Sequence, residues 1–470
     1  MKSKNPNSDP RQRRRSATPK QHSSFPHDRP RAIGDLVCKA GRDTMHMDGS
    51  DCAHPPALLR PHHPIIEVGI GMPHLKSLYP PIPDIDIPNY YDFVTGLEHF
   101  KSLPDYTLFI DGLTGEKRRL RAFFERVDAC ATALASEEAV GGLNVLANPN
   151  EIVGIFSENS MEWPTLVYSC LKLGVPFALL PAYSTAAEFR HLLKTSESTR
   201  LFVSPSVFET ALTVAREVGL PEDRIGTSGL PKAVMISHKN LCYSLMQTVT
   251  IGREFAKVAT PPPPNTPEGV PCAVAFMPFY HVTAFHLCMM RIFTPPCTIV
   301  ILPRWKLDTV LDALQKYDVT NFGLVPSMAH EFINSPRFQT TDFSKVASFM
   351  SGAAQLPLEH RKAILERMPH VHIRDDRMYI SIPRNSPPRP LPRPHQMLTM
   401  TGILLPGCEA RIVREDGSEA GYDEPGELLV RGGHVALGYW KNEAATRGSF
   451  LLDRWLRTGD QFTVDRQGAF

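Results

Sequence analysis

This 470-residue sequence lacks the features that mark several classes of protein. Its nine cysteines form no Cys-x-x-Cys pair and no Cys/His spacing of a metal site, and they are scattered through apolar stretches. Such cysteines are typical of buried free thiols in a reducing compartment. The first residues are basic but contain no apolar core of a secretory signal. We therefore expect no disulfide framework, no metal ligands and an intracellular, cytoplasmic protein.

Long uninterrupted apolar runs are also missing. The most apolar region, residues 271–302, is broken by His281, His286, Arg291 and four prolines. It therefore predicts buried strands and a helix rather than a membrane span. The sequence does not end in the peroxisomal Ser-Lys-Leu signal.

The sequence also lacks a large excess of positive or negative charge, because its formal net charge is only +2. Residues 1–71 carry 12 Lys/Arg and 7 Asp/Glu, a net charge of +5, so residues 72–470 sum to −3. The body of the chain thus has no nucleic-acid signature, and we expect no nucleic-acid partner. Residues 1–71 are rich in Pro, His, Arg and Ser and show no helical or strand period, which predicts a disordered basic tail.

The apolar pattern beyond residue 116 predicts an α/β fold. Residues 117–136 read as an amphipathic helix. Strand–helix units with short links are typical of a parallel sheet covered on both faces, and ligands bind at the carboxyl ends of such strands. From Leu405 onward, short strands with Gly and Asp-Gly turns predict a separate antiparallel sheet or barrel. The predicted strands are residues 152–156, 176–180 and 201–203, and the helices that follow them are residues 161–173, 185–193 and 206–214.

A glycine- and hydroxyl-rich loop that ends in lysine occupies residues 226–232. Glycines let backbone N–H groups approach phosphate oxygens, the hydroxyls donate hydrogen bonds, and Lys232 adds a positive charge. The Walker loop is excluded, because Ala233 stands where that loop needs a Ser or Thr to hold Mg²⁺. The structural alternative is a plain turn before a strand.

This loop resembles the phosphate loop of adenylate-forming enzymes, which include acyl-CoA synthetases, 4-coumarate–CoA ligases, luciferases and peptide-synthetase adenylation domains. Three later segments are similar to motifs of the same family, in its order. Residues 351–354 resemble the segment that lies against adenine, residues 426–428 with 438–440 resemble a late sheet motif, and residues 456–460 resemble the motif whose Asp holds the ribose hydroxyls. The resemblance covers residues 72–470. It implies two αβαβα-type parallel-sheet subdomains and a small β-barrel.

The resemblance also implies a reaction. ATP with Mg²⁺ and an aromatic or fatty carboxylic acid give acyl-AMP and pyrophosphate, and CoA, the co-substrate, then takes the acyl group as a thioester. Catalytic roles fall to Lys232 and His281. Nucleotide contacts fall to Gly226, Thr227, Ser228, Gly229, Lys232, Gly352, Ala353, Ala354 and Asp460. Acyl-substrate contacts fall to Tyr280, His281, Gly323 and Ser351. From the residues alone, His281 is equally a core histidine and Asp460 an exposed loop acid.

The sequence departs from the family at three places. Residues 221–225 run directly into the glycine-rich loop, where the family has a few dozen residues that include an apolar strand. A foreign Pro/Arg-rich segment at about 374–400 replaces a Tyr-Gly-x-Thr-Glu motif whose Glu binds Mg²⁺; residues 383–394 contain six prolines and three arginines. The sequence ends ten residues after Asp460, so the family's C-terminal lid is expected to be absent.

Three hypotheses follow for residues 72–470. The preferred one is a partial, impaired acyl-CoA synthetase similar to 4-coumarate–CoA ligases, a group in which peroxisomal members also occur. The second is an inactive pseudoenzyme that binds a nucleotide or a partner, with the proline-rich segment as a polyproline ligand; translated intron sequence is the other interpretation of that segment. The third is a stand-alone or peptide-synthetase adenylation domain. The acid and the oligomeric state are not predicted.

Overall fold

The computed structural model of the chain describes residues 74–84, 89–221, 234–257, 264–290, 293–352, 354, 356–376, 380–381 and 402–470. The predicted basic tail, the glycine-rich loop and most of the Pro/Arg-rich segment lie outside the described residues.

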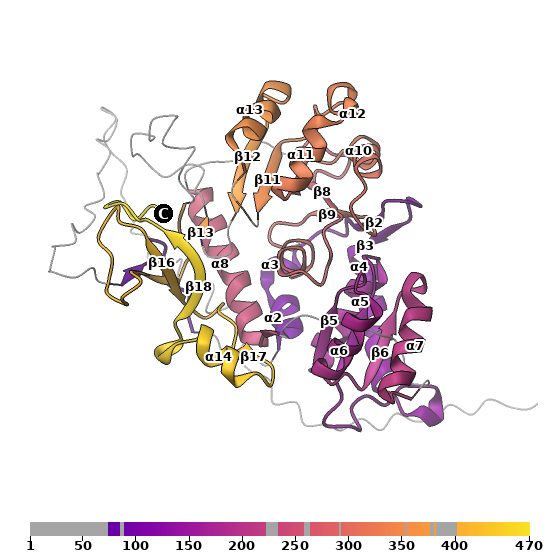
Figure 1. Cartoon of the computed structure of the whole chain (residues 1–470). Helices are drawn as coiled ribbons and strands as arrows, with labels where there is room; N and C mark the ends of the chain where they lie inside the picture. Colours follow the sequence, from indigo (N-terminus) through magenta and orange to yellow (C-terminus); the bar gives the residue numbers. More distant parts are fainter. Residues whose placement is uncertain are drawn as a thin grey trace, which may run out of the picture. The chain divides into compact units, whose positions relative to one another are not determined.

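The larger of two parallel sheets has seven strands (Figure 1). They are β2 (Thr107–Asp111), β3 (Lys117–Arg119), β8 (Cys272–Ala275), β9 (Thr298–Ile301), β10 (Asn321–Leu324), β11 (Ser348–Gly352) and β12 (His372–Asp376). Their spatial order is β12-β11-β10-β8-β9-β2-β3, and every neighbouring pair is parallel except β2 and β3. All four residues of β9 are buried, as expected for a strand that is covered on both faces.

A phenylalanine-rich core packs helices onto the β10–β12 part of this sheet. Phe322 of β10 meets Phe349 of β11 and Phe332 in edge-to-face contacts, with ring centroids 5.2 and 5.6 Å apart. Such pairs add to the stabilisation from burial. Figure 1 shows the helices gathered beside β11 and β12. They are α10 (Leu307–Lys316), α11 (Pro326–Asn334), α12 (Pro336–Thr340) and α13 (Leu358–Arg367).

A second core joins the large sheet to α2 (Tyr90–Gly96), α4 (Leu120–Ala135) and α5 (Glu162–Leu173). The helix predicted at residues 117–136 is thus present but starts three residues later, because Lys117–Arg119 pair with β2 as a strand. One face of the helix is buried, as an amphipathic helix requires, and Phe124 beside that face is half-buried. The buried residues are Leu120, Phe123, Val127, Ala131 and Leu134.

The smaller parallel sheet contains β5 (Phe177–Leu180), β4 (Val153–Phe156) and β6 (Arg200–Val203), in that spatial order. The predicted strand–helix alternation is therefore confirmed here. The Thr185 hydroxyl and the Glu188 carboxylate form the reciprocal capping box at the start of α6 (Ala186–Ser196). The next helix, α7 (Phe208–Val218), begins two residues later than predicted, after a single 3₁₀ turn, η2 (Pro205–Val207).

Strand β6 forms an edge of this sheet. Among the described residues, β4 is its only strand neighbour. A parallel strand that is buried on both faces normally has partners on both sides, and an open edge exposes unpaired backbone groups. The sequence departure before Gly226, where the family has a further strand, follows β6 and α7 in the chain.

An antiparallel sheet carries the C-terminal part of the chain. It contains β1 (Leu75–Lys76), β15 (Glu409–Val413), β16 (Gly426–Arg431) and β18 (Leu456–Phe462). This confirms the change of pattern predicted from Leu405. Asp416-Gly417 makes a turn in which Gly417 has φ +83° and Arg414 N–H donates to the Ser418 carbonyl at 2.8 Å.

Several further elements are short, and one strand bears on the Pro/Arg-rich segment. Strand β12 includes residues 374–376, so the parallel sheet extends into the first residues of the segment predicted as foreign. The short elements are α3 (Glu98–Lys101), η1 (Glu138–Val140), β7 (Val234–Met235), β13 (Ile380–Ser381), β14 (Ile403–Leu404), β17 (Gly438–Tyr439), α14 (Glu443–Ser449) and η5 (Leu452–Arg454); α8, α9 and η4 are described with the candidate site.

The seven cysteines in the described part of the chain are free thiols, five of them buried. Burial raises the pKa of Cys288 to about 12, so this thiol stays protonated. No helix among the described residues is both long and apolar enough to cross a membrane.

The buried ion pair that fixes β6 to the start of β4 provides a test of the smaller sheet. Arg200 Nε lies 2.9 Å from Glu151 Oε1, and the side chains are 8% and 3% exposed. Removing the guanidinium leaves a buried carboxylate without its counter-charge. We expect Arg200→Met to lower the free energy of unfolding by about 3–5 kcal/mol in urea titrations.

The double variant Arg200→Met/Glu151→Leu should recover most of that loss, because no buried charge remains. The control is Arg190→Met, because the partner of Arg190, Glu217, lies on α7 and the two side chains are 38% and 43% exposed. It should cost about 1 kcal/mol or less. Equal losses in the buried and the exposed pair would contradict this account of β6.

Candidate functional site

The carboxyl ends of the parallel strands bring several predicted site residues to one edge of the large sheet. Ser351 and Gly352 end β11, and Gly323 lies near the end of the neighbouring strand β10. The register sets Gly323 beside Met350 and Leu324 beside Ser351. Tyr280 follows β8, which is the next strand in the same direction. This edge is where open α/β sheets bind their ligands.

Ser351 is the most distinctive residue at this edge. Its side chain is fully buried, yet its Oγ has no hydrogen-bond partner among the described residues. A buried hydroxyl normally has a partner, and a bound ligand is one way to supply it. The position therefore suits a ligand that presents a hydrogen-bonding group to the end of β11.

Gly323 lets β10 and β11 approach closely. A Cβ added here would lie 3.1 Å from both Met350 Cε and the Met350 carbonyl oxygen. Any larger residue would have to displace Met350, which directly precedes Ser351. Close packing against Met350 thus gives a structural reason for a glycine at position 323, whether or not it also lines a binding site.

The turn after β8 carries Tyr280 and His281. His281 N–H donates to the Pro278 carbonyl at 2.9 Å, which closes the turn. His281 then caps α9 (Val282–Phe285), because its Nδ1 accepts from Thr283 N–H at 3.3 Å. An accepting Nδ1 places the imidazole proton on Nε2, which is thus the nitrogen able to donate. The His281 side chain is exposed, so the alternative of a core histidine is wrong.

Tyr280 is half-buried, and burial raises the pKa of its phenol. The hydroxyl therefore remains a neutral donor and acceptor. Helix α9 passes directly into a π-helical turn, η4 (His286–Met290). Such turns occur frequently at functional sites.

Asp460 lies on β18 of the antiparallel sheet rather than at the edge of the parallel sheet. Thr458 Oγ1 donates to the Leu428 carbonyl at 2.8 Å and accepts from Asp460 N–H at 3.1 Å. Gly459 has φ +76°, a conformation that glycine adopts without strain. These contacts fix the backbone at Asp460, whose carboxylate is exposed.

Arg457 of the same motif forms an ion pair with Glu427 of β16, with Arg457 Nε 3.0 Å from Glu427 Oε2. The hydrogen bond from Arg457 holds the pKa of Glu427 below its usual value. Each residue of the Arg457–Asp460 motif that precedes the aspartate thus has a structural role in shaping the strand.

The other predicted nucleotide contacts are only partly described. Ala354 lies just beyond β11 and is exposed. The rest lie outside the described residues: Gly226, Thr227, Ser228, Gly229, Lys232 and Ala353. Lys232 precedes β7 by two residues in the chain, and β7 pairs antiparallel with β17 of the predicted late sheet motif.

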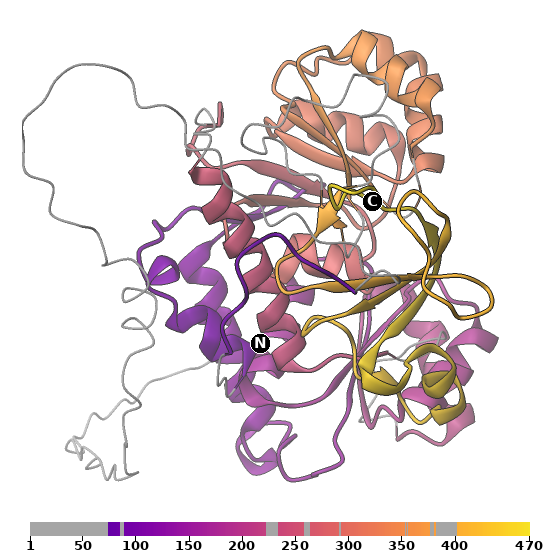
Figure 2. The ribbon, with the colours of Figure 1, turned by 90° about the vertical axis from the view of Figure 1, so that its left-hand side faces the viewer.

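Helix α8 (His238–Ala256) follows the glycine-rich loop and holds the C-terminal sheet (Figures 1 and 2). Asn240 Nδ2 donates at 2.8 Å to the carbonyls of both Gly433 and Val435. Gln247 Nε2 donates to the Pro406 carbonyl at 2.9 Å. One side of α8 thereby fixes the loops of the antiparallel sheet.

The first residue of α8 attaches the helix to α2. Nδ1 of His238 accepts from Tyr90 N–H at 2.9 Å. Burial lowers the pKa of His238, so the neutral ring that can accept this bond is the favoured form.

Sequence reasoning missed two residues that link the carboxyl ends of the two parallel sheets. Asn159 follows β4 and binds backbone groups beyond β8 and β9, and Tyr183 follows β5 and donates to the Pro303 carbonyl at 2.9 Å. Their only signal in the sequence is position: each is a polar residue just past a predicted strand.

Known proteins similar to this chain share one family description. A family model described as AMP-binding enzyme matches residues 98–223 and 226–440. The break between the two matched parts falls directly before the glycine-rich loop, where the sequence predicts a missing strand.

Individual relatives agree with that description. Probable 4-coumarate–CoA ligase 1 of Dictyostelium discoideum is 26% identical over 461 residues, which cover 85% of this chain and 79% of that protein. The luciferase-like enzyme of the nonluminescent Zophobas morio mealworm aligns with a TM-score of 0.65 at 17% identity, over 85% of this chain and 97% of that one. ATP-bound MatB of Rhodopseudomonas palustris aligns with a TM-score of 0.63 at 21% identity, over 81% of this chain and 77% of that one. These structural likenesses confirm the predicted fold class.

The bond between His238 and Tyr90 predicts a pH dependence of stability. A histidine whose pKa is lower in the folded chain than in the unfolded chain binds fewer protons when folded. Its contribution to stability is complete above the unfolded pKa of about 6.5 and falls as the pH drops through that value. We expect His238→Asn, whose Oδ1 can accept the same bond without titrating, to flatten the loss of melting temperature between about pH 7.5 and about pH 5.5.

His191→Asn is the matched control, because His191 is an exposed residue of α6. This variant should keep the parent's slope. If both variants show the parent's slope in calorimetric scans, then His238 does not contribute to the pH dependence.

Proposed function

The chain belongs to the AMP-binding enzyme family, and we propose that it activates a carboxylic acid as an acyl adenylate and transfers the acyl group to CoA. The observation that carries this proposal is the carboxyl edge of the large sheet. There Ser351, whose hydroxyl has no hydrogen-bond partner in the described part of the chain, lies one strand away from Gly323 and two from the strand that leads to Tyr280. Relatives named as 4-coumarate–CoA ligases support a CoA ligase.

The proposed chemistry has two steps. A carboxylate oxygen attacks the α-phosphorus of ATP, bound as its Mg²⁺ complex, and pyrophosphate leaves. The thiol of CoA then attacks the carbonyl carbon of the mixed anhydride, AMP leaves, and the thiol proton passes to solvent. Negative charge grows on the phosphate oxygens in the first step, so catalysis depends mostly on positioning and on cationic or N–H donors.

Each predicted site residue receives a role in this scheme. Lys232 and the backbone of the glycine-rich loop neutralise the β- and γ-phosphates, and the segment from Gly352 to Ala354 lies against adenine. The Asp460 carboxylate accepts hydrogen bonds from the ribose hydroxyls. Tyr280 and His281 border the acid, with the Nε2–H of His281 available to its carboxylate. Gly323 and Ser351 lie at the acyl end, which suits an aromatic or fatty acid.

A second candidate function is nucleotide binding without efficient turnover. Two observations favour it: the family match is interrupted directly before the glycine-rich loop, and β6 has a single strand neighbour among the described residues. A phosphate loop needs a rigid base to act within the tolerance that catalysis allows. The two candidates differ in whether acid-dependent pyrophosphate release is fast.

The first experiment compares the chain with a variant that carries the corresponding segment of the Dictyostelium ligase between Asp223 and Gly226. We expect slow acyl-adenylate formation by the chain and a gain of at least about tenfold in the variant, because small displacements of catalytic groups cost large factors in rate. Pyrophosphate release, hydroxamate trapping and CoA-thioester formation are measured with cinnamic and medium-chain acids. Acid-independent ATP binding without pyrophosphate release in either protein would favour the second candidate. Full turnover by the original chain, with no gain, would contradict the structural importance of the missing strand.

The second experiment tests the ribose role of Asp460. We expect Asp460→Ala to weaken ATP binding by roughly 1.5–3 kcal/mol, the usual value of a charge-assisted hydrogen bond. Glu443→Ala is the control, because it removes an exposed carboxylate of α14 that pairs only with Arg447 one turn away. Calorimetric titration with ATP and AMP provides the comparison. Equal losses in the two variants, or an unchanged affinity for Asp460→Ala, would rule out the ribose role.

A further inference from the structure

Asn159 connects the two parallel sheets through one buried amide. It lies in the loop between β4 and α5 and is 5% exposed. Its Nδ2 donates to the Met277 carbonyl at 2.9 Å and to the Leu302 carbonyl at 3.2 Å, and its Oδ1 accepts from Phe279 N–H at 2.8 Å. All three partners are backbone groups just beyond the carboxyl ends of β8 and β9.

The amide is the functional group that this position requires. Both hydrogens and the oxygen of a primary amide are used, so Asn159 satisfies two buried acceptors and one buried donor at once. A carboxylate would lose both donors and would face two carbonyl oxygens. An apolar residue would leave all three backbone groups without this partner, which is costly for buried groups.

The segment that Asn159 holds is the turn with Tyr280 and His281. Phe279 N–H, the bonded donor, directly precedes Tyr280 in a turn closed by the bond from His281 N–H to the Pro278 carbonyl. The buried Phe279 ring packs edge-on against Trp163 of α5, with centroids 5.5 Å apart. The β4–α5 unit therefore contacts this turn in two ways: Asn159 bonds to its backbone, and Trp163 packs against the Phe279 ring.

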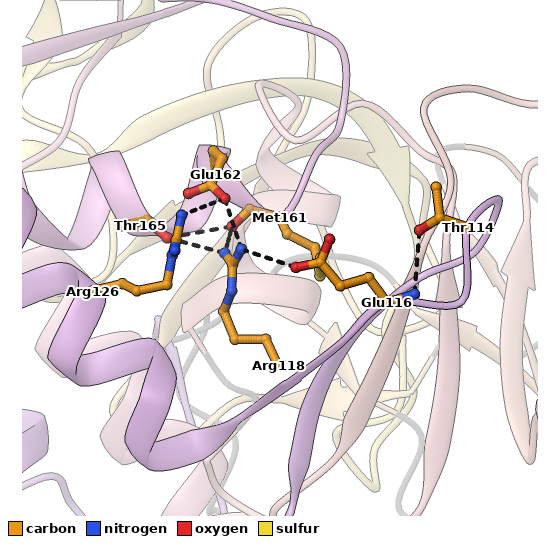
Figure 3. Close-up of polar contacts among 7 residues, drawn as sticks. All are labelled: Thr114, Glu116, Arg118, Arg126, Met161, Glu162 and Thr165. Atoms are coloured by element: carbon orange, nitrogen blue, oxygen red, sulfur yellow. Dashed lines mark hydrogen bonds and ion pairs between the residues drawn. The ribbon is translucent and has the colours of Figure 1, made fainter. Parts of the chain in front are cut away.

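The loop that carries Asn159 is itself anchored (Figure 3). Arg118 of β3, 5% exposed, donates through Nη1 to the Met161 carbonyl at 2.6 Å and through Nη2 to Glu162 Oε1 at 2.7 Å. Arg126 of α4 donates to the same carboxylate oxygen at 2.8 Å. Burial opposes ionisation of Glu162, but the bonds from Arg126 and Arg118 hold its pKa below the usual value. The chain is thus fixed two residues beyond Asn159.

We propose that Asn159 is a positioning residue of the site: its amide sets the place of the Tyr280–His281 turn relative to the β4–α5 unit, and thereby the position of the acid that the turn borders. The role toward the acid rests on the proposed function. The placement of the turn rests only on the contacts above. The two parts are therefore tested by separate measurements.

The first measurement is hydrogen exchange in the full chain. Asn159→Asp should speed exchange of peptides that cover residues 276–285 by about tenfold, because the Phe279 N–H loses a fixed partner and the two carbonyls are repelled. Peptides that cover the Arg118–Glu162 contacts should keep the parent's rates. Asn159→Ser, which removes the amide without burying a charge, is used if the Asp variant does not fold.

Tyr183→Phe is the matched control. Its hydroxyl bridges the same two sheets, but it donates to the Pro303 carbonyl beyond β9 and not to the turn. Exchange in residues 276–285 should stay within about twofold of the parent. Uniformly faster exchange across the chain in the Asn159 variants, or an equal effect of Tyr183→Phe on the turn, would mean a general structural role and would overturn the proposal.

The second measurement is steady-state acyl-adenylate formation. Asn159→Asp should raise KM for the acid by about tenfold while kcat and KM for ATP change by less than about threefold, the pattern of lost uniform binding to one substrate. Parallel losses for acid and ATP would overturn the role toward the acid. A parent chain without acid-dependent pyrophosphate release would refute the proposed function, and the exchange data would still decide whether Asn159 positions the turn.

Discussion

The parallel pairing of β8, β10 and β11 is the constraint on which the candidate site depends. Because these strands run in one direction, the segments that leave them emerge at one edge of the sheet, so the turn with Tyr280 and the end of β11 share that edge. Phenylalanines of these strands and of the helices packed on them support this pairing, and Gly323 permits the close approach of β10 to Met350. The packed residues that stabilise the sheet lie within the strands, whereas the candidate site residues lie at the carboxyl ends of the strands.

The sequence predicted those parts of the fold that depend on neighbours in the chain. The strand–helix units after residue 150 were found because their patterns repeat within a few residues. Lys117–Arg119 were predicted as helix and form β3, because β2 provides backbone partners that the local pattern does not contain. Pairing between distant segments overrides local periodicity.

The same division separates the candidate site residues. Ser351 and Asp460 were proposed through motifs, each a short run of neighbouring residues. Asn159 was missed because its partners Met277 and Leu302 are 118 and 143 positions away. A lone asparagine after a strand has many uses, and only the folded chain shows which carbonyls face it. Motifs therefore predict candidate ligand contacts more readily than residues whose partners lie far away in the chain.

The contacts of α8 with the antiparallel sheet have a consequence for divergence between relatives. Asn240 and Gln247 bond to the carbonyls of Gly433, Val435 and Pro406, and every amino acid offers the same carbonyl. A substitution at Val435 therefore leaves the bonded carbonyl in place. Gly433 is different, because a Cβ added there would lie 2.4 Å from Cδ2 of Tyr243 on α8. The helix side of this contact thus requires particular side-chain groups, whereas the sheet side requires a backbone path and, at Gly433, the absence of a side chain.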